Sequence, residues 1–217
     1  MVGDPPYRVC IDAGHGGSDP GARGVVEEKE MTAQTSEALL ALLEADPNYI
    51  PLRSRESYDA TAKPSERAEA INAQSPQLLL SIHGNSAPEG SAASGLSVIR
   101  PSRAVHGIRR AITSRSSWRR ECRPQRKASR PRRHPVHLLS GRGKAARREH
   151  PYRSRDERSF TLLEDVNCPA VLAEQCFVTS EEDVAQFGSE EGCKTVARVY
   201  YEAICAYFGT QPLDTPL

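Results

Sequence analysis

The sequence predicts an α/β fold: a single domain with a twisted, mostly parallel sheet that is flanked by helices on both faces and interrupted by an Arg-rich irregular segment. Three observations predict this fold class. Short apolar strand patterns alternate with helical patterns, which is typical of a sheet covered by helices. The run Leu78-Leu79-Leu80-Ser81-Ile82 suits a strand that is buried on both faces. The 217 residues are enough for one domain with a substantial core.

The expected elements are a strand at 7–12, a helix at 28–45, a strand at 49–53, a helix at 64–73, strands at 78–82, 95–99 and 169–173, and a helix at 196–208. The first strand ends in the glycine-rich turn of residues 13–17, where the chain must bend sharply. In each helix, apolar residues recur on one face. Pro47 ends the first helix, and Pro64 suits the first turn of the second. The last helix has the clearest pattern, and Gly209 ends it.

The segment of residues 103–158 breaks this pattern. Residues 101–160 hold 19 Lys and Arg against 4 Asp and Glu, whereas the rest of the chain holds 10 against 24. Without a helical or strand period and with few apolar residues, this Arg-rich segment is expected to be disordered or irregular. Residues 210–217 are predicted to form a loose tail.

Composition argues against several classes of protein. No apolar run approaches the roughly 18 residues that a transmembrane helix needs, so we expect no membrane partner. The N-terminus lacks the basic and apolar regions of a secretory signal, which predicts synthesis in the cytoplasm. The six cysteines form no C-x-x-C pair, so we expect mostly buried thiols rather than a zinc knuckle.

Outside the Arg-rich segment the chain has only two histidines, His15 and His83, and each follows a predicted strand. The carboxyl ends of neighbouring parallel strands border one crevice, where the two imidazoles could converge. Glu28, at the start of the first helix, can face the same crevice. Two His and one carboxylate are the ligand set of a catalytic zinc with an open position. Glu174, at the end of another predicted strand, could then act as general base.

Each of these residues also has an ordinary structural interpretation. A single His after a strand is often a hydrogen-bonded turn residue, and the spacing here forms no compact signature such as H-E-x-x-H. Glu27 and Glu30 are rivals for Glu28, because the helix dipole favours any carboxylate in the first turn. The residue pattern alone therefore leaves both a metal site and a structural role open.

Several short motifs occur in the order in which one enzyme family carries them. They are Ile11-Asp12-Ala13-Gly14-His15-Gly16-Gly17-Ser18-Asp19-Pro20-Gly21-Ala22, Glu28-Lys29-Glu30, Ser54-Arg55-Glu56, Glu66-Arg67-Ala68 with Asn72, Ser81-Ile82-His83-Gly84-Asn85, and Cys168-Pro169-Ala170-Val171-Leu172-Ala173-Glu174 with Phe177. Together they resemble the zinc-dependent N-acetylmuramoyl-L-alanine amidases of the third amidase type, which are cell-wall hydrolases. The resemblance covers about residues 7–100 and 160–208.

The resemblance implies a role for each matching residue. The Zn²⁺ ligands would be His15, Glu28 and His83. Glu174 would activate the water that attacks the lactyl carbonyl of N-acetylmuramic acid, and Asn85 and Arg67 are candidates for substrate binding. The implied reaction is hydrolysis of the amide bond between N-acetylmuramic acid and L-alanine in peptidoglycan, without an organic cofactor. Residues 1–217 would form one catalytic domain of bacterial or prophage origin that acts at the cell wall.

The Arg-rich segment departs from the family, which carries a helix and a strand at this place. The resemblance implies that Phe160 to Leu163 form the end of that strand. Three interpretations stay open: a compensated frameshift, a cationic tether for anionic polymers, and an ordinary insertion or regulatory segment. Trp118 and Tyr152 are its only aromatic residues. The segment therefore offers few side chains on which nucleic-acid bases could stack, and we do not expect a nucleic-acid partner. The alternative function is a catalytically impaired amidase fold that binds polyanions or the cell wall through this segment.

Overall fold

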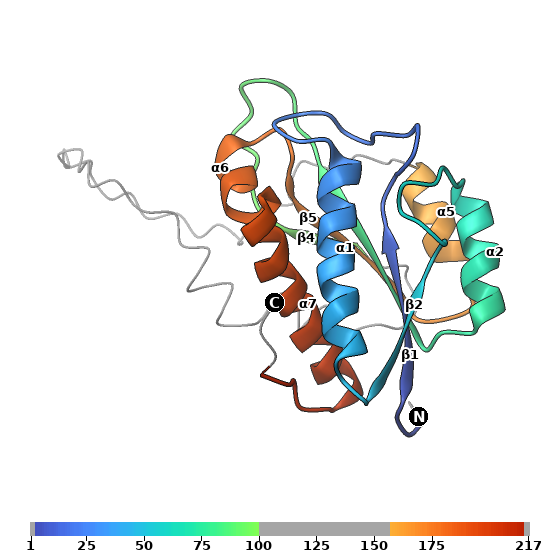
Figure 1. Cartoon of the computed structure of the whole chain (residues 1–217). Helices are drawn as coiled ribbons and strands as arrows, with labels where there is room; N and C mark the ends of the chain where they lie inside the picture. Colours follow the sequence, from blue (N-terminus) through green and yellow to red (C-terminus); the bar gives the residue numbers. More distant parts are fainter. Residues whose placement is uncertain (1–2, 100–156, 215–217) are drawn as a thin grey trace, which may run out of the picture.

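The computed structural model describes residues 3–99 and 157–214. Figure 1 shows one layered body with a sheet at its centre. Residues 103–156 of the Arg-rich segment lie outside the described residues, and so does the prediction that was made for them. Within the described residues, no helix combines the length and the apolar character needed to cross a membrane.

Among the described residues, five strands form the sheet, in the order β2-β1-β3-β5-β4. The strands are β1 (Tyr7–Ala13), β2 (Tyr49–Arg53), β3 (Leu78–Asn85), β4 (Ser97–Ile99) and β5 (Ala170–Phe177). The first three and β5 run parallel to their neighbours, whereas β4 pairs antiparallel with β5 at one edge. The prediction of a mostly parallel sheet is therefore confirmed.

Helices cover both faces of the sheet, as the sequence predicts. The helices are α1 (Glu28–Glu44), α2 (Pro64–Gln74), α5 (Glu157–Asp165), α6 (Glu181–Asp183), a π-helical turn η1 (Val184–Gly188) and α7 (Glu190–Phe208). Helices α1 and α7 lie side by side on one face, and α2 and α5 lie together on the other (Figure 1). The four parallel strands are thus enclosed between two helical layers.

Alternating residues of the central strands supply both cores. Val9 and Ile11 of β1 pack in the core under α1 and α7, whereas Cys10 between them packs in the core under α2 and α5. Leu80 and Leu79 of β3 divide between the two cores in the same way. Burial on both faces explains why the sequence of β3 is a continuous apolar run.

The prediction of a strand end at Phe160 to Leu163 is wrong, because these residues belong to helix α5. Leu162, Leu163 and Val166 recur at helical spacing, and all three are buried in the core that α2 contributes to. Strand β5 also continues past its predicted end, to Phe177. Strand β3 likewise continues to Asn85, so His83 and Glu174 both lie inside strands instead of directly after them.

The predicted loose tail is attached at its beginning. The Tyr49 hydroxyl is hydrogen-bonded to the Thr210 hydroxyl, and the backbone N–H of Leu213 donates to the Tyr201 hydroxyl at 2.8 Å. These contacts hold the chain after α7 against β2 and α7 as far as residue 213. Residues 215–217 lie outside the described part of the chain.

The five described cysteines are all free thiols. Cys10, Cys176, Cys193 and Cys205 are buried, and Cys168 is partly buried. The prediction of mostly buried thiols is confirmed for them, and Cys122 lies outside the described residues.

Candidate active site

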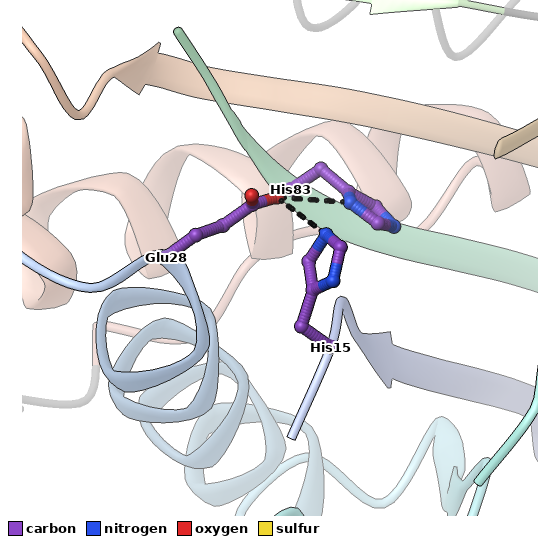
Figure 2. Close-up of side chains that lie close together, drawn as sticks. All are labelled: His15, Glu28 and His83. Carbon is purple, nitrogen blue, oxygen red and sulfur yellow. Dashed lines mark hydrogen bonds and ion pairs between the residues drawn. The ribbon is translucent and has the colours of Figure 1, made fainter. Parts of the chain in front are cut away.

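Three side chains from separate elements converge at the carboxyl ends of β1 and β3. His15 lies in the loop that follows β1, His83 lies near the end of β3, and Glu28 lies in the first turn of α1. Figure 2 shows both imidazole rings pointing at the Glu28 carboxylate. The convergence follows from the parallel pairing of β1 with β3, which brings the two strand ends side by side.

The distances within this cluster are short. Glu28 Oε1 lies 3.2 Å from His15 Nε2 and 3.0 Å from His83 Nδ1. One ligand atom from each residue lies within 4.8 Å of the other two. Two imidazole nitrogens and a carboxylate oxygen cannot face one another so closely unless protons or a cation lie between them. The arrangement therefore fits a metal ion, and two imidazoles with one carboxylate are ligands that suit zinc.

Backbone amides hold the Glu28 carboxylate in place. The N–H of Gly84 donates to Oε1 and the N–H of Ala22 donates to Oε2, each at 2.8 Å. Of the three first-turn carboxylates that the sequence left as candidates, only Glu28 joins the cluster. Glu30 is exposed, and Glu27 pairs with Arg23 and Lys29 instead.

The electrostatics of the cluster centre on the buried Glu28 carboxylate. Burial acts to raise the pKa of Glu28, but hydrogen bonds and charge from His15 and His83 outweigh it and hold this pKa well below its ordinary value. For His15, burial acts to lower the pKa, but Glu28 and Asp19 outweigh it and raise the pKa to about 9. The site thus favours cationic occupants beside Glu28.

The close packing of the cluster depends on Gly21, which has a positive φ of 65°. A Cβ atom here would lie 2.6 Å from Glu28 Oε2 and 2.6 Å from His15 Cδ2. We expect Gly21→Ala to weaken zinc affinity by about 10- to 100-fold, the range found when residues that support metal ligands are changed. Competition with a chromophoric chelator measures this affinity.

Gly90→Ala is the matched control for this prediction. Gly90 has a similar φ of 77°, but a Cβ there meets nothing within 4 Å. The Gly90→Ala variant has comparable backbone strain, but its added Cβ atom does not contact the cluster. It should therefore bind zinc like the wild type. Equal affinities in the two variants would contradict the packing argument.

A cleft of about 640 Å³ opens over the cluster. All six candidate site residues from the sequence line it: His15, Glu28, Arg67, His83, Asn85 and Glu174. Glu174 is the direct register partner of His83 in the neighbouring strand. The lining of the cleft also includes Thr61, Lys63 and Leu162.

Arg67 also belongs to a buried ion pair under the cleft. Its Nη1 donates to both oxygens of Asp12, at 3.0 and 2.9 Å. Asp12 is fully buried and also accepts a 2.7 Å hydrogen bond from the Ser81 hydroxyl. Arg67 therefore supports the floor of the cleft as well as lining it.

Two residues that touch the site were not singled out from the sequence. Asp19 Oδ2 lies 2.8 Å from His15 Nδ1, and the Arg55 guanidinium donates to the backbone carbonyl of His15. An acidic residue four positions after a candidate histidine is a signal that could have identified Asp19. Arg55 is distant in sequence and lies within a motif whose role could not be inferred from spacing.

Comparisons with known proteins agree on one family. The family model described as N-acetylmuramoyl-L-alanine amidase matches residues 9–206. A sporulation-specific N-acetylmuramoyl-L-alanine amidase of Bacillus subtilis is 38% identical over 80 residues, which are 36% of this chain and 31% of that protein. A probable N-acetylmuramoyl-L-alanine amidase AmiB of Haemophilus influenzae is 38% identical over 84 residues, 37% of this chain and 19% of that protein. The chain thus spans less than a third of the length of these two relatives.

Solved structures share the fold at low sequence identity. A crystal structure of N-acetylmuramoyl-L-alanine amidase from Clostridium difficile 630 superimposes with a TM-score of 0.71 and 21% identity, covering 94% of this chain and 98% of that one. N-acetylmuramoyl-L-alanine amidase AmiC2 of Nostoc punctiforme gives a TM-score of 0.70 and 22% identity, covering 95% and 99%. With a family model matched over most of its length, the chain belongs to the N-acetylmuramoyl-L-alanine amidase family.

Proposed function

We propose that this protein hydrolyses the amide bond between N-acetylmuramic acid and L-alanine in peptidoglycan, with one Zn²⁺ held by His15, Glu28 and His83. The observation that carries the proposal is the convergence of three ligand atoms within 4.8 Å, in a cleft that Glu174 also lines. Membership of the family supports the choice of reaction. The geometry of the cluster supports the choice of residues that would perform it. The substrate implies that the protein acts at a bacterial cell wall.

The bound zinc would supply a Lewis acid that polarises the amide carbonyl and makes water acidic enough to react near neutral pH. The chain would supply the rest. Glu174 takes a proton from the attacking water as the new C–O bond forms at the lactyl carbonyl carbon. As the C–N bond breaks, Glu174 passes that proton to the amine of L-alanine. The products are the lactyl carboxylate on the glycan and a stem peptide with a free amino end.

The position of Glu174 supports this role. It is paired in register with His83, so its side chain starts from the strand adjacent to a proposed ligand. It is partly buried and lines the same cleft as all three proposed ligands. A base must lie within reach of the proton it takes, and this strand pairing keeps Glu174 close to the centre of the site.

Asn85 and Arg67 differ in how their side chains could contact the substrate. Asn85 is partly buried at the end of β3 and lines the cleft, so we propose that its side-chain amide binds the substrate near the scissile bond. Arg67 is only 6% exposed, and Asp12 occupies its Nη1. We propose that Arg67 acts mainly by holding the cleft floor in shape.

Digestion of purified peptidoglycan by the zinc-loaded protein tests the proposed reaction. Mass spectrometry should detect stem peptides with a free L-alanine amine and glycan strands with intact reducing ends. A parallel digest with His83→Ala should release neither product. New reducing sugar ends would identify a glycosidase, and cleavage within the stem peptide would identify a peptidase; either result would overturn the proposal.

A further inference from the structure

His15 has a backbone conformation that is unfavourable for a residue with a side chain. Its φ is +62°, and Ser75 is the only other non-glycine residue in the described ranges with a positive φ. The loop around it is closed by two backbone hydrogen bonds between Gly16 and Asp19, at 2.9 and 3.0 Å. Such a conformation persists only where neighbouring groups enforce it.

Asp19 holds the ring of His15. Its Oδ2 lies 2.8 Å from His15 Nδ1, and its Oδ1 accepts the N–H of Gly21 at 3.1 Å. A carboxylate accepts hydrogen bonds only, so His15 Nδ1 must carry the proton. The lone pair of the neutral ring then belongs to Nε2, the atom that faces Glu28. Asp19 therefore selects the tautomer that can bind a metal.

Arg55 holds the backbone of the same loop. Its Nη2 donates to the carbonyl of His15, and its Nη1 donates to the carbonyl of Ala13 at 3.0 Å. The side chain is only 6% exposed, and its Nη1 lies 3.5 Å from an oxygen of Asp12. A Cβ on Gly16 would lie 2.6 Å from Arg55 Nη2, so the glycine leaves the room that the guanidinium occupies.

We propose that Asp19 and Arg55 are positioning residues for the metal centre: Asp19 fixes the tautomer and angle of the His15 ring, and Arg55 fixes the strained backbone that carries it. This inference rests on the proposed function, because it assumes that His15 is a metal ligand. In the part of the chain that the structure describes, neither side chain is hydrogen-bonded to or ion-paired with Glu28 or His83, so their contact with the metal site runs through His15.

Asp19→Asn tests the tautomer directly. The side-chain oxygen must still accept the hydrogen bond from the N–H of Gly21. The new amide NH₂ is therefore turned toward His15 Nδ1. His15 Nδ1 would then have to accept a hydrogen bond from this NH₂ group. The ring proton would therefore move to Nε2, where it blocks metal binding. We expect zinc affinity to fall by about 10- to 100-fold, measured by chelator competition on the full chain. Asp19→Ala leaves the ring free to choose its tautomer and should lose less affinity than Asp19→Asn.

Arg55→Lys tests the backbone contact. Lysine keeps a positive charge near Asp12 but cannot span both carbonyls as the planar guanidinium does. We expect zinc affinity to fall by about 10-fold. Arg53→Lys is the matched control. Arg53 and Arg55 both lie over the ring of Tyr58, but Arg53 pairs with Glu37, outside this loop. It should bind zinc like the wild type.

The thermal midpoint of the metal-free protein separates positioning from a merely structural role. Asp19 is well exposed, so loss of its ion pair with His15 in Asp19→Asn should lower this midpoint by no more than about 2–4 °C while zinc binding weakens. A lowered midpoint with wild-type zinc affinity would overturn the proposal, as would an Asp19→Asn variant that binds zinc as tightly as Asp19→Ala. Failure of the wild-type chain to bind zinc would instead overturn the metal assignment itself, together with this inference.

Discussion

Glu174→Gln should lower amide hydrolysis by about 100- to 10,000-fold, the usual contribution of general acid–base catalysis. Glutamine has nearly the same shape as glutamate but cannot take a proton from water. Because Glu174 lies outside the cluster of three ligand atoms, zinc affinity should stay within a few-fold of the wild type. The measurement is the rate of release of free L-alanine amino ends from peptidoglycan, beside a zinc titration of the same protein.

Glu181→Gln is the control for this substitution. Glu181 is exposed at the start of α6 and does not line the cleft that holds the cluster. It should hydrolyse peptidoglycan at the wild-type rate. If Glu174→Gln did the same, Glu174 would not be the base. If it lost zinc as well as activity, its role would be that of a ligand.

Asp12→Asn should destabilise the fold by about 3–5 kcal/mol, the cost of removing one partner from a buried ion pair. The Asp12 carboxylate is fully buried, and the Arg67 and Arg55 guanidinium groups both lie within 3.5 Å of it. Without the carboxylate, two buried cations would face a neutral amide. Urea unfolding of the metal-free protein measures the loss, and Asp59→Asn, at an exposed site, should change little.

The same residue predicts a pH dependence. Burial acts to raise the pKa of Asp12, but the charge of Arg67 and the hydroxyl of Ser81 outweigh it, so this pKa lies below the ordinary value of 3.8. A lowered folded-state pKa contributes stability that is fully present above the unfolded value and is lost as the pH falls through the folded one. The difference in unfolding free energy between wild type and Asp12→Asn should therefore shrink below about pH 4. A difference that stayed constant down to pH 2 would contradict this assignment.

The sheet was predictable because its strands are buried on both faces. The apolar run of β3 and the shorter run in β1 identify strands without any knowledge of their partners. Once the sheet is taken as parallel, the histidines at the carboxyl ends of these strands must lie at one edge, and the structure brings them together with Glu28. The choice among Glu27, Glu28 and Glu30 could not be made in this way. It depends on which carboxylate the backbone of Gly84 can reach.

The remaining features depend on contacts between distant parts of the chain. The resemblance led to a strand end at Phe160 to Leu163, where the chain forms helix α5. A few apolar residues fit both periods, and packing against α2 decides between them. The pair of Asp12 and Arg67 joins residues 55 positions apart, and the contact of Arg55 with His15 joins residues 40 apart. No local pattern encodes such pairs, so the residues beneath the site could not be assigned from the sequence.

A zinc titration of the metal-free protein, with hydrolysis of peptidoglycan measured at each step, tests the central claim most directly. We predict no hydrolysis without metal, a linear rise to a maximum at one equivalent of zinc per chain, and no activation of His83→Ala at the same zinc concentrations. Hydrolysis by the metal-free protein, or equal activation of His83→Ala, would contradict the claim that a single zinc ion held by His15, Glu28 and His83 catalyses the reaction.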